Sequence, residues 1–545
     1  MKKLTYLIAI LLVGIFMLSS CTKGWVDMNK SPNNPTEVPP TNVLAHVIRA
    51  TGDVFYDDWQ GMNNFLSYTG LVTKIQYIDE ARLDERESTI NAAWHDYYLL
   101  LEDLKKVQEL ADAKTNDRYN KNIKAAAMTF SAFLWIMATD QWGYIPYTDA
   151  LKGDDPQNPI TNPKYDSQKD IYTGPNGIIA MLEKAYSMYD PAAAASGSDI
   201  IGDGDLIYHG DVTKWMKFTG SLLLRVAIRL SYVDPALSKQ ILQDITSGKY
   251  MVFESRDDEA KLKWPGTSPY YEPWYNNHYI NGRDDHAVAK TIIDSLYNWH
   301  DLRLLAIAHP ASEESGHLLV INGDSLWFKG QIEGATDADK DLKASRIGYI
   351  YRDDPAGYTW FERYAEVEFD LAEAYYRADL LNDPTQAEQY YINGITASYE
   401  EMSADPNFGA LIAQSLPNYL ASPKVKFGPV GDHSMFNFKR GEGSSAQYVD
   451  DNLVRIWVQK WIAMFKEGQE EWAAMRRTDF PKMPVPEGAV AYLASHNRAP
   501  QRYPYPVDEE NLNKKNLEDA ITAQNLSGRY TFWGAMWWDT RPGIH

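Results

Sequence analysis

The sequence predicts a mostly α-helical protein with four helix pairs, long irregular loops and little β-sheet. Two observations point to this class. In the longest patterned segments apolar residues recur every three or four positions, which is the period of an amphipathic helix. Stretches rich in proline, glycine, tyrosine and asparagine separate these segments, and such composition favours loops. With 545 residues and 44% apolar content, the chain is long enough to bury a large core without disulfides.

The amino end has the layout of an export signal. Two lysines precede an apolar run over residues 4–18, which is shorter than the roughly 20 residues that a membrane-spanning helix needs. The sequence LSSC at residues 18–21 then looks like the lipobox of bacterial lipoproteins, where the cysteine is acylated and the peptide bond before it is cut. We therefore expect a signal peptide over residues 1–20 and a lipid anchor at Cys21, the only cysteine. The alternative is a signal peptide with an incidental cysteine.

A tether is expected directly after the anchor. Residues 21–42 include the stretch "NKSPNNPTEVPPTN", whose prolines and asparagines cannot build a core. The folded domain is then expected over residues 43–545.

The first two helix pairs lie in the amino-terminal half. Helical spacing predicts one antiparallel pair over residues 90–104 and 123–137, joined by a polar stretch. A second pair is predicted over residues 178–189 and 215–230, and a proline follows each of its helices.

The other two pairs lie in the carboxy-terminal half. The third is predicted over residues 359–378 and 387–402, where Thr359 and Glu362 have the spacing of a capping box. Its small and aromatic residues approximate the tetratricopeptide pattern. The fourth comprises residues 453–465 and, after a break at glycine, the stretch "QEEWAAMRRTDFP". We expect Lys460, within the apolar stripe of this pair, to ion-pair with an acid such as Glu471.

Four long loops connect the helices, at residues 143–176, 250–285, 310–358 and 403–450. Loops of this length are uncommon unless they bind something. The short apolar pieces "HLLVING" and "SLWFKG" in the third loop could form a hairpin.

Charge excludes one class of partner. The 53 basic and 74 acidic residues give a formal charge of −21, and no basic cluster interrupts the excess. Because phosphate binding requires a basic footprint, nucleic acid is not expected as a partner. A polyanionic ligand is disfavoured for the same reason, and a neutral ligand fits better.

Motifs for catalysis or metal binding are weak. The sequence has no H-E-x-x-H, G-x-S-x-G or phosphate-loop motif. The spacing of Asp337, Asp339 and Asp341 matches the first ligand positions of a calcium-binding loop. The later positions, where that loop needs glycine and glutamate, do not match, which favours a solvated turn. Four side chains close in sequence could hold a metal, on spacing alone: His278, Asp284, Asp285 and His286. We therefore predict no catalytic residue, metal or cofactor.

The aromatic segment "WPGTSPYYEPWYNNHY" at residues 264–279 is the strongest candidate for a binding site. Its prolines and glycine forbid a regular helix, and no apolar stripe accounts for its six rings. Rigid rings suit stacking on the faces of sugars or on peptide side chains, and nearby amides and a guanidinium can fix orientation. The candidate ligand-binding residues are Trp264, Tyr270, Tyr271, Trp274, Tyr275, Asn276, Asn277 and Arg283. The alternative, of equal weight, is that these rings cap the core beneath a long loop.

Several stretches, taken together and in this order, resemble the SusD/RagB family of nutrient-binding outer-membrane lipoproteins of Bacteroidetes. They are "TDQWGYIPYTDAL", "DLIYHGDVTKWMKFTGSLLLRVAIRLS", "RYAEVEFDLAEAYYRA", "VQKWIAMFKEGQEEWAAMRRTDFP" and "RYPYPVDEENLN". The resemblance implies a single SusD-like domain with four tetratricopeptide-like helix pairs, anchored at the cell surface as a lid on a TonB-dependent transporter. It also implies that the protein captures a glycan or peptide, which the transporter imports.

The sequence leaves two rival functions open. The many carboxylates neither select nor exclude a glycosidase pair, so a secreted all-helical glycoside hydrolase is one alternative. The other is a repeat scaffold that only assembles proteins, which predicts an aromatic loop packed away from solvent. Our expectation is a non-enzymatic protein that binds an oligosaccharide or peptide.

Overall fold

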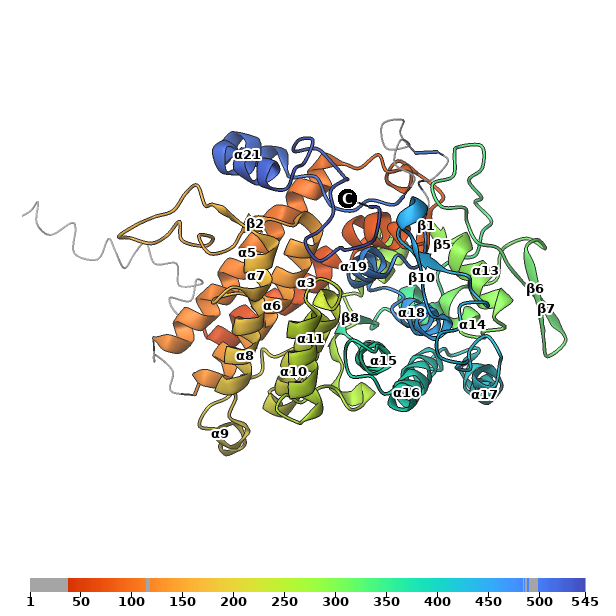
Figure 1. Cartoon of the computed structure of the whole chain (residues 1–545), viewed down its shortest axis with the longest axis horizontal. Coiled ribbons are helices and arrows are strands. Elements are labelled where there is room, and N and C mark those ends of the chain that lie inside the picture. The colour runs from red at the N-terminus through yellow and green to blue at the C-terminus, as the bar shows by residue number, and fades with distance from the viewer. Residues whose placement is uncertain (1–37, 114–117, 484, 486–487, 490–497, 545) are drawn as a thin grey trace, which may run out of the picture.

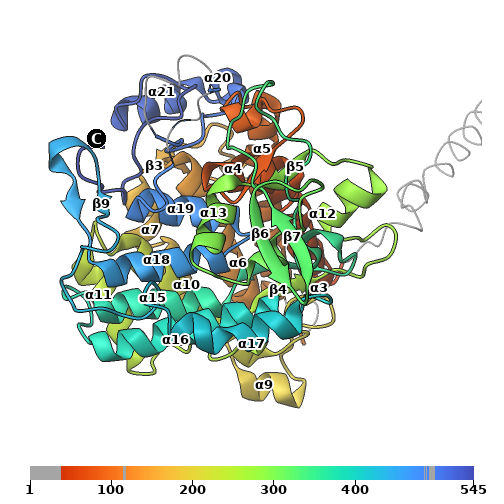
Figure 2. The same cartoon turned by 90° about the vertical axis from the view of Figure 1, so that its right-hand side faces the viewer.

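The computed structural model describes residues 38–113, 118–483, 485, 488–489 and 498–544. Within this part of the chain, helices make up most of the regular structure, and the strands occur only as short antiparallel pairs (Figures 1 and 2). The predicted signal peptide, the acylation site at Cys21 and most of the predicted tether lie outside the described residues. In the part that is described, no helix combines the length and the apolar character needed to cross a membrane.

The amino-terminal half forms a block of neighbouring helices, on the left of Figure 1. They are α3 (Pro40–Phe55), α5 (Glu87–Asp112), α6 (Lys121–Trp142), α8 (Ile178–Met188), α10 (Val212–Leu230) and α11 (Pro235–Thr246). The first predicted pair is α5 with α6, and the second is α8 with α10. Helix α6 lies at the centre of the block, because every residue from Ala125 to Trp142 is buried. Since α3 begins at Pro40, the last residues of the predicted tether belong to a helix.

The carboxy-terminal half forms a second block. Its helices are α15 (Tyr364–Tyr376), α16 (Pro384–Met402), α17 (Gly409–Leu420), α18 (Asp451–Ala463) and α19 (Gly468–Thr478). The third predicted pair is α15 with α16, and a Cβ added at Gly394 would lie only 2.7 Å from the Phe369 ring. A small residue is therefore what lets these two helices approach, as the tetratricopeptide pattern predicts. Helix α18 packs on α15 and α16, whereas α19 packs chiefly on the segment that follows α3.

One local prediction in this block is wrong, and another is right except for the partner that it names. Thr359 and Glu362 do not form a capping box, because they lie in strand β8 (Tyr358–Glu362), which pairs with β4 (Ala260–Lys263), and helix α15 begins only at Tyr364. Lys460 does ion-pair with an acid, as predicted, but that acid is not Glu471. Because α18 packs on α15, its ammonium donates to Asp370 of that helix at 2.8 Å.

The remaining strands also form two-stranded antiparallel pairs. These pairs are β1 (Val72–Lys74) with β5 (His286–Val288), β2 (Ile145–Pro146) with β3 (Tyr165–Asp166), β6 (His317–Ile321) with β7 (Asp324–Phe328), and β9 (Lys439–Arg440) with β10 (Gln447–Tyr448). The pair β6–β7 is the predicted hairpin, and it projects at the right of Figure 1. Its turn residues Asn322 and Gly323 both have positive φ, which explains why this dipeptide is favoured there.

Short helical segments occupy the loops and the carboxy-terminal region. They are η1 (Asp58–Phe65), α4 (Leu66–Tyr68), η2 (Glu80–Arg82), α7 (Gln168–Thr173), α9 (Pro191–Ser196), η3 (Arg256–Asp258), α12 (Pro273–Tyr275), η4 (Asn276–Ile280), α13 (Lys290–Asn298), α14 (Leu304–Ile307), η5 (Tyr349–Asp353), η6 (Gly443–Ser445), α20 (Val507–Leu512) and α21 (Lys514–Ala523).

The carboxy-terminal segment returns to the amino-terminal block. Asn64 donates to the Tyr503 hydroxyl at 2.5 Å, and the Trp142 indole donates to the Pro504 carbonyl at 2.9 Å. The main-chain amide of Tyr503 also donates to Gln141 at 2.7 Å. Residues far apart in the sequence therefore complete one another's hydrogen bonding in the core.

Candidate functional site

The aromatic segment is held by a buried ion pair beneath it. Glu272 precedes helix α12, and its carboxylate accepts from the main-chain amide of Tyr275 at 2.9 Å. The other carboxylate oxygen accepts from the Lys466 ammonium at 2.8 Å, and both side chains are buried. This pairing fixes the start of a helical turn that continues into η4.

Three tyrosines form a continuous row of rings on this turn. Tyr271, Tyr275 and Tyr279 are four residues apart, a spacing that puts side chains on one face of a helix. The ring centroids of Tyr271 and Tyr275 are 5.5 Å apart, and those of Tyr275 and Tyr279 are 4.7 Å apart. Tyr279 is 49% exposed and the other two are half-buried. We call this row the tyrosine ladder, and it offers a solvent-facing surface of aromatic rings.

The two tryptophans of the segment face the core instead. Trp264 is 2% exposed and donates to the Thr359 hydroxyl at 3.0 Å, while Trp274 is 1% exposed and donates to the Tyr56 carbonyl at 2.9 Å. No ligand can stack on these rings in this structure, because protein covers them. These two residues fit the alternative given in the sequence analysis, in which the rings cap the core beneath a loop. Asn277 is also buried.

The other candidate residues lie at the surface around the ladder. Tyr270 is exposed, and the Arg49 guanidinium lies 5.4 Å from its ring. Asn276, next to Tyr275 in the chain, is half-buried. Arg283 is exposed and donates to the carboxylate of Asp285 at 2.8 Å. These side chains can supply hydrogen bonds beside the rings.

The structure adds one exposed aromatic residue that the sequence reasoning missed. Tyr77 is exposed, and the guanidinium of the candidate residue Arg283 lies 4.9 Å from its ring. Tyr77 is an isolated aromatic in the sequence, so no local pattern distinguishes it from a core residue.

The side chains whose spacing in the sequence alone could suit a metal are engaged with the protein. Asp284 accepts from Arg346 at 2.9 Å, His278 lies 2.7 Å from the Arg283 carbonyl, and His286 lies 2.7 Å from the side-chain oxygen of Asn63. Burial lowers the pKa of His286 to about 3. Among the residues that the structure describes, no group of three or more metal-ligating side chains is present.

The aspartates that resemble the start of a calcium loop lie in an ion-paired turn. The Asp337 carboxylate is 3.0 Å from the Lys340 ammonium, and Asp341 is 2.6 Å from that of Lys329. These contacts are those of a solvated turn.

This fold and this site define a class of protein, namely helical-repeat proteins with aromatic rings on the surface of one long loop. The sequence matches the SusD-like family described as "Starch-binding associating with outer membrane" over residues 32–506. The chain therefore belongs to the SusD-like family, whose members are outer-membrane-associated nutrient-binding proteins.

Solved structures share the fold. A chitin-binding SusD homologue from Flavobacterium johnsoniae is similar with a TM-score of 0.71 and 19% identity, covering 92% of this chain and 98% of its own. A SusD homologue from Bacteroides fragilis has a TM-score of 0.70 and 22% identity, covering 93% and 100%. One from Parabacteroides distasonis has a TM-score of 0.72 and 18% identity, covering 92% and 98%. No curated protein sequence matches the chain.

Proposed function

We propose that the protein is a lipid-anchored outer-membrane receptor that binds a neutral oligosaccharide or a peptide on the tyrosine ladder. It then delivers this nutrient to a partner TonB-dependent transporter. The observation that carries the proposal is the ladder itself, a row of one exposed and two half-buried rings with hydrogen-bonding side chains at its edge. The exposed part of an aromatic ring can stack on the apolar face of a sugar, and the polar side chains at the edge select orientation.

Two carboxylates near the ladder, Asp284 and Asp353, favour binding over catalysis. Burial raises the pKa of Glu272 beneath the ladder, but that side chain is covered by protein and paired with Lys466. Glycoside hydrolysis by a carboxylate pair needs one acid whose pKa is raised. Burial acts to raise the pKa of Asp353, but hydrogen bonds from His309 and Arg352 outweigh it and hold that pKa below its usual value. The pKa of Asp284 is likewise lowered, because contacts with Arg346 outweigh burial. Neither group suits the role of a general acid.

The comparisons favour a glycan over a peptide as the first ligand to test. Two of the similar solved structures are named as chitin-binding proteins. The acidic chain also favours an uncharged ligand, because a net charge of −21 repels polyanions. Chitin oligosaccharides are neutral and present the sugar faces that rings stack on. We therefore place neutral oligosaccharides first among the candidate nutrients.

The experiment is a binding and turnover assay on the mature chain. Neutral oligosaccharides, with chitin oligosaccharides first, and a set of short peptides are titrated by calorimetry, and each mixture is then incubated and analysed for cleavage. We expect saturable binding of at least one ligand and no cleavage products. Cleavage would establish the glycoside hydrolase instead, and the absence of any ligand affinity would establish the scaffold.

The partner is tested separately by co-purification from the native outer membrane. A barrel transporter of the TonB-dependent class is expected to remain bound after gentle detergent extraction. Purification of the receptor without any barrel protein would contradict this part of the proposal.

A further inference from the structure

A cavity of 520 Å³ lies at the carboxy-terminal end of α19, away from the tyrosine ladder. Its walls come from the region after β9, from the end of α19 and from the segments around Ala499 and Arg541. The cavity and the ladder share no residue, and Figure 2 shows β9 and α12 on opposite sides of the view. This volume is within the range of small-molecule sites and is large enough for one sugar residue.

The cavity is lined by more cations than its carboxylates neutralise. The cationic side chains are Arg476, Lys482, Arg498 and Arg541, and the carboxylates in its wall are Glu442 and Asp479. Arg498 is paired with Glu442 at 2.7 Å and Lys482 with Asp479 at 2.8 Å. Arg541 is paired with Asp539 at 2.8 Å and with Asp479 at 3.0 Å. With Asp539 included, three carboxylates pair with three of the four cations. Among the cations that the structure describes in this wall, Arg476 is the one without a carboxylate partner.

Arg476 is buried without a carboxylate partner. It is 1% exposed, and the hydrogen bonds it donates within the described part of the chain go to the main-chain carbonyls of Trp472, Asp140 and Gln501. Its Nη2 atom has no hydrogen-bond partner among the described residues. Burial lowers the pKa of Arg476 to about 9.

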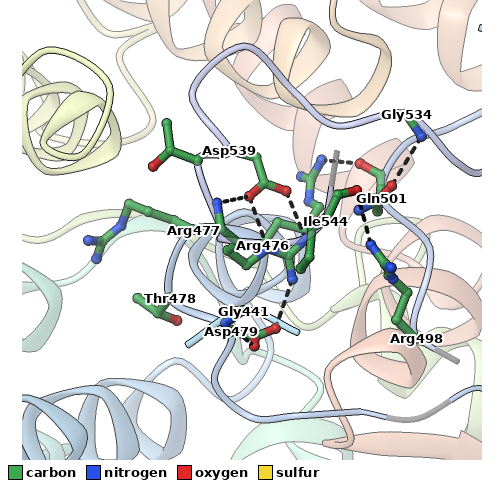
Figure 3. Close-up of polar contacts among 12 residues, drawn as sticks. Gly441, Arg476, Arg477, Thr478, Asp479, Arg498, Gln501, Gly534, Asp539 and Ile544 are labelled. Atoms are coloured by element: carbon green, nitrogen blue, oxygen red, sulfur yellow. Dashed lines mark hydrogen bonds and ion pairs between the residues drawn. The ribbon is translucent and has the colours of Figure 1, made fainter. Parts of the chain in front are cut away.

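The nearest acidic groups are already committed to other arginines. Asp140 lies 3.0 Å from Arg229, and Asp539 is paired with Arg541. The neighbouring Arg477 differs in this respect, because it donates to both oxygens of Glu373. Figure 3 shows the side chains of Arg476 and Arg477 pointing in different directions, with Arg477 leading away from the other labelled groups.

A buried guanidinium with an unsatisfied nitrogen is costly unless something neutralises it. The indole ring of Trp472, 3.6 Å from the guanidinium carbon, holds Arg476 in place but does not cancel its charge. Because Arg476 is part of the cavity wall, an oxyanion bound in the cavity would supply one negative charge beside this buried guanidinium. A planar guanidinium binds such groups through short, charge-assisted hydrogen bonds.

We propose that this cavity is a second ligand site, which binds a sugar-sized molecule carrying a single negative charge as a carboxylate or a sulfate ester. Arg476 supplies the uncompensated positive charge in the cavity wall that attracts the oxyanion. Arg498 lies at the rim and orients the same group. The site is independent of the tyrosine ladder, so its failure would leave the proposed function standing.

Calorimetry at low ionic strength tests the site with three matched probes, which are glucose, glucuronate and glucose 6-sulfate. We expect glucuronate or glucose 6-sulfate to bind at least tenfold more tightly than glucose, with an affinity that falls as salt is added. The two charged probes distinguish a carboxylate ligand from a sulfate ester. Equal affinity for all three probes, or no binding of either charged probe, would overturn the proposal.

Variants of cavity residues provide a second test of the proposed site. Arg498→Gln changes a rim residue and Arg476→Gln the buried one, and each is expected to weaken binding of the charged probe at least tenfold. Arg256→Gln is the matched control, because Arg256 also pairs with a glutamate, Glu259, but lies outside the cavity. If circular dichroism shows that Arg476→Gln does not fold, the affinity of Arg498→Gln for the charged probe alone tests the proposal. Unchanged affinity in Arg498→Gln, or an equal loss in Arg256→Gln, would overturn the proposal.

Discussion

The indole nitrogen of Trp274 donates to the main-chain carbonyl of Tyr56 at 2.9 Å, which ties the loop bearing the tyrosine ladder to the end of helix α3. Trp274 sits one residue before Tyr275, so the same turn presents one ring to the core and the next to the surface. The buried ring therefore positions the ladder without touching a ligand.

Trp274→Ala is expected to destabilise the fold rather than only weaken binding. Removing a buried tryptophan leaves a cavity and an unpaired carbonyl, a cost of about 3 to 5 kcal/mol. Trp274→Phe keeps most of the volume and is the milder control. The measurement is the free energy of unfolding in urea. An alanine variant that unfolds at the same urea concentration as the parent would show that the ring is not a structural support.

Lys466→Met is expected to be strongly destabilising, because it leaves Glu272 buried without its counterion. Breaking one partner of a buried pair costs about 3 to 5 kcal/mol. The double variant Lys466→Met with Glu272→Gln should recover part of this loss, since no uncompensated charge then remains. Denaturant unfolding of Lys466→Met, of Glu272→Gln and of the double variant measures the coupling. Additive losses would mean that the two side chains do not interact.

Tyr271→Ala, Tyr275→Ala and Tyr279→Ala are each expected to reduce ligand affinity by about 1 to 3 kcal/mol, the scale of an aromatic anchor. Tyr279→Ala should leave the melting temperature unchanged, because that ring is half exposed. Tyr448→Ala, which removes an equally exposed tyrosine on β10, is the control. Calorimetric titration with the ligand found in the screen measures the effect. Unchanged affinity in all three variants would remove the ladder from the binding site.

Glu471→Gln is expected to stabilise the protein at alkaline pH and to have little effect at pH 5. Burial raises the pKa of Glu471 to about 8, from an ordinary value of 4.5. The folded state therefore holds a proton that the unfolded state releases, and this contribution to stability is lost as the pH rises from about 4.5 to 8. Glutamine has no proton to lose.

Glu373→Gln is the opposite control for this pH dependence. Two arginines, Arg477 and Arg377, outweigh burial and lower the pKa of Glu373 to about 2. Its contribution is present above about pH 4.5 and is lost as the pH falls towards 2. Melting temperatures between about pH 2 and pH 9 should thus separate the two variants. Parallel pH profiles for both variants would contradict the opposite pKa shifts assigned to Glu471 and Glu373.

Cys21→Ala is expected to release the protein from the membrane fraction, because acyl chains on that thiol are the proposed anchor. Fractionation of cells and labelling with a fatty-acid analogue measure the effect. Retention of the alanine variant in the membrane fraction would show that another element holds it there.

The helical framework was predictable because it depends on periodicity. The pairs α5 with α6, α8 with α10 and α15 with α16 all follow apolar spacing, and the β6–β7 hairpin follows from its Asn322-Gly323 turn. The misplaced start of α15 has a physical cause. Tyr358–Glu362 pairs with a strand almost a hundred residues earlier, and this long-range contact overrides the local capping pattern.

The candidate site was predictable only as a segment. Its density of rings marked residues 264–279 as unusual, but not which ring faces water, because proline and glycine remove the periodicity that would separate the two sides. The partner of Lys460 was missed for a related reason. Only the packing of α18 on α15 brings Asp370 closer than Glu471. The cavity around Arg476 depends on segments brought together from several parts of the chain, which no local motif reveals.

Tyr503 and Pro504 hydrogen-bond to Asn64, Gln141 and Trp142. These bonds determine when the nascent chain can complete the core of its amino-terminal block. Synthesis begins at the amino end. The helices made first therefore keep an incomplete interior until residues 503 and 504 have been synthesised. The amino-terminal block can reach its final hydrogen bonding only when nearly the whole chain has left the ribosome.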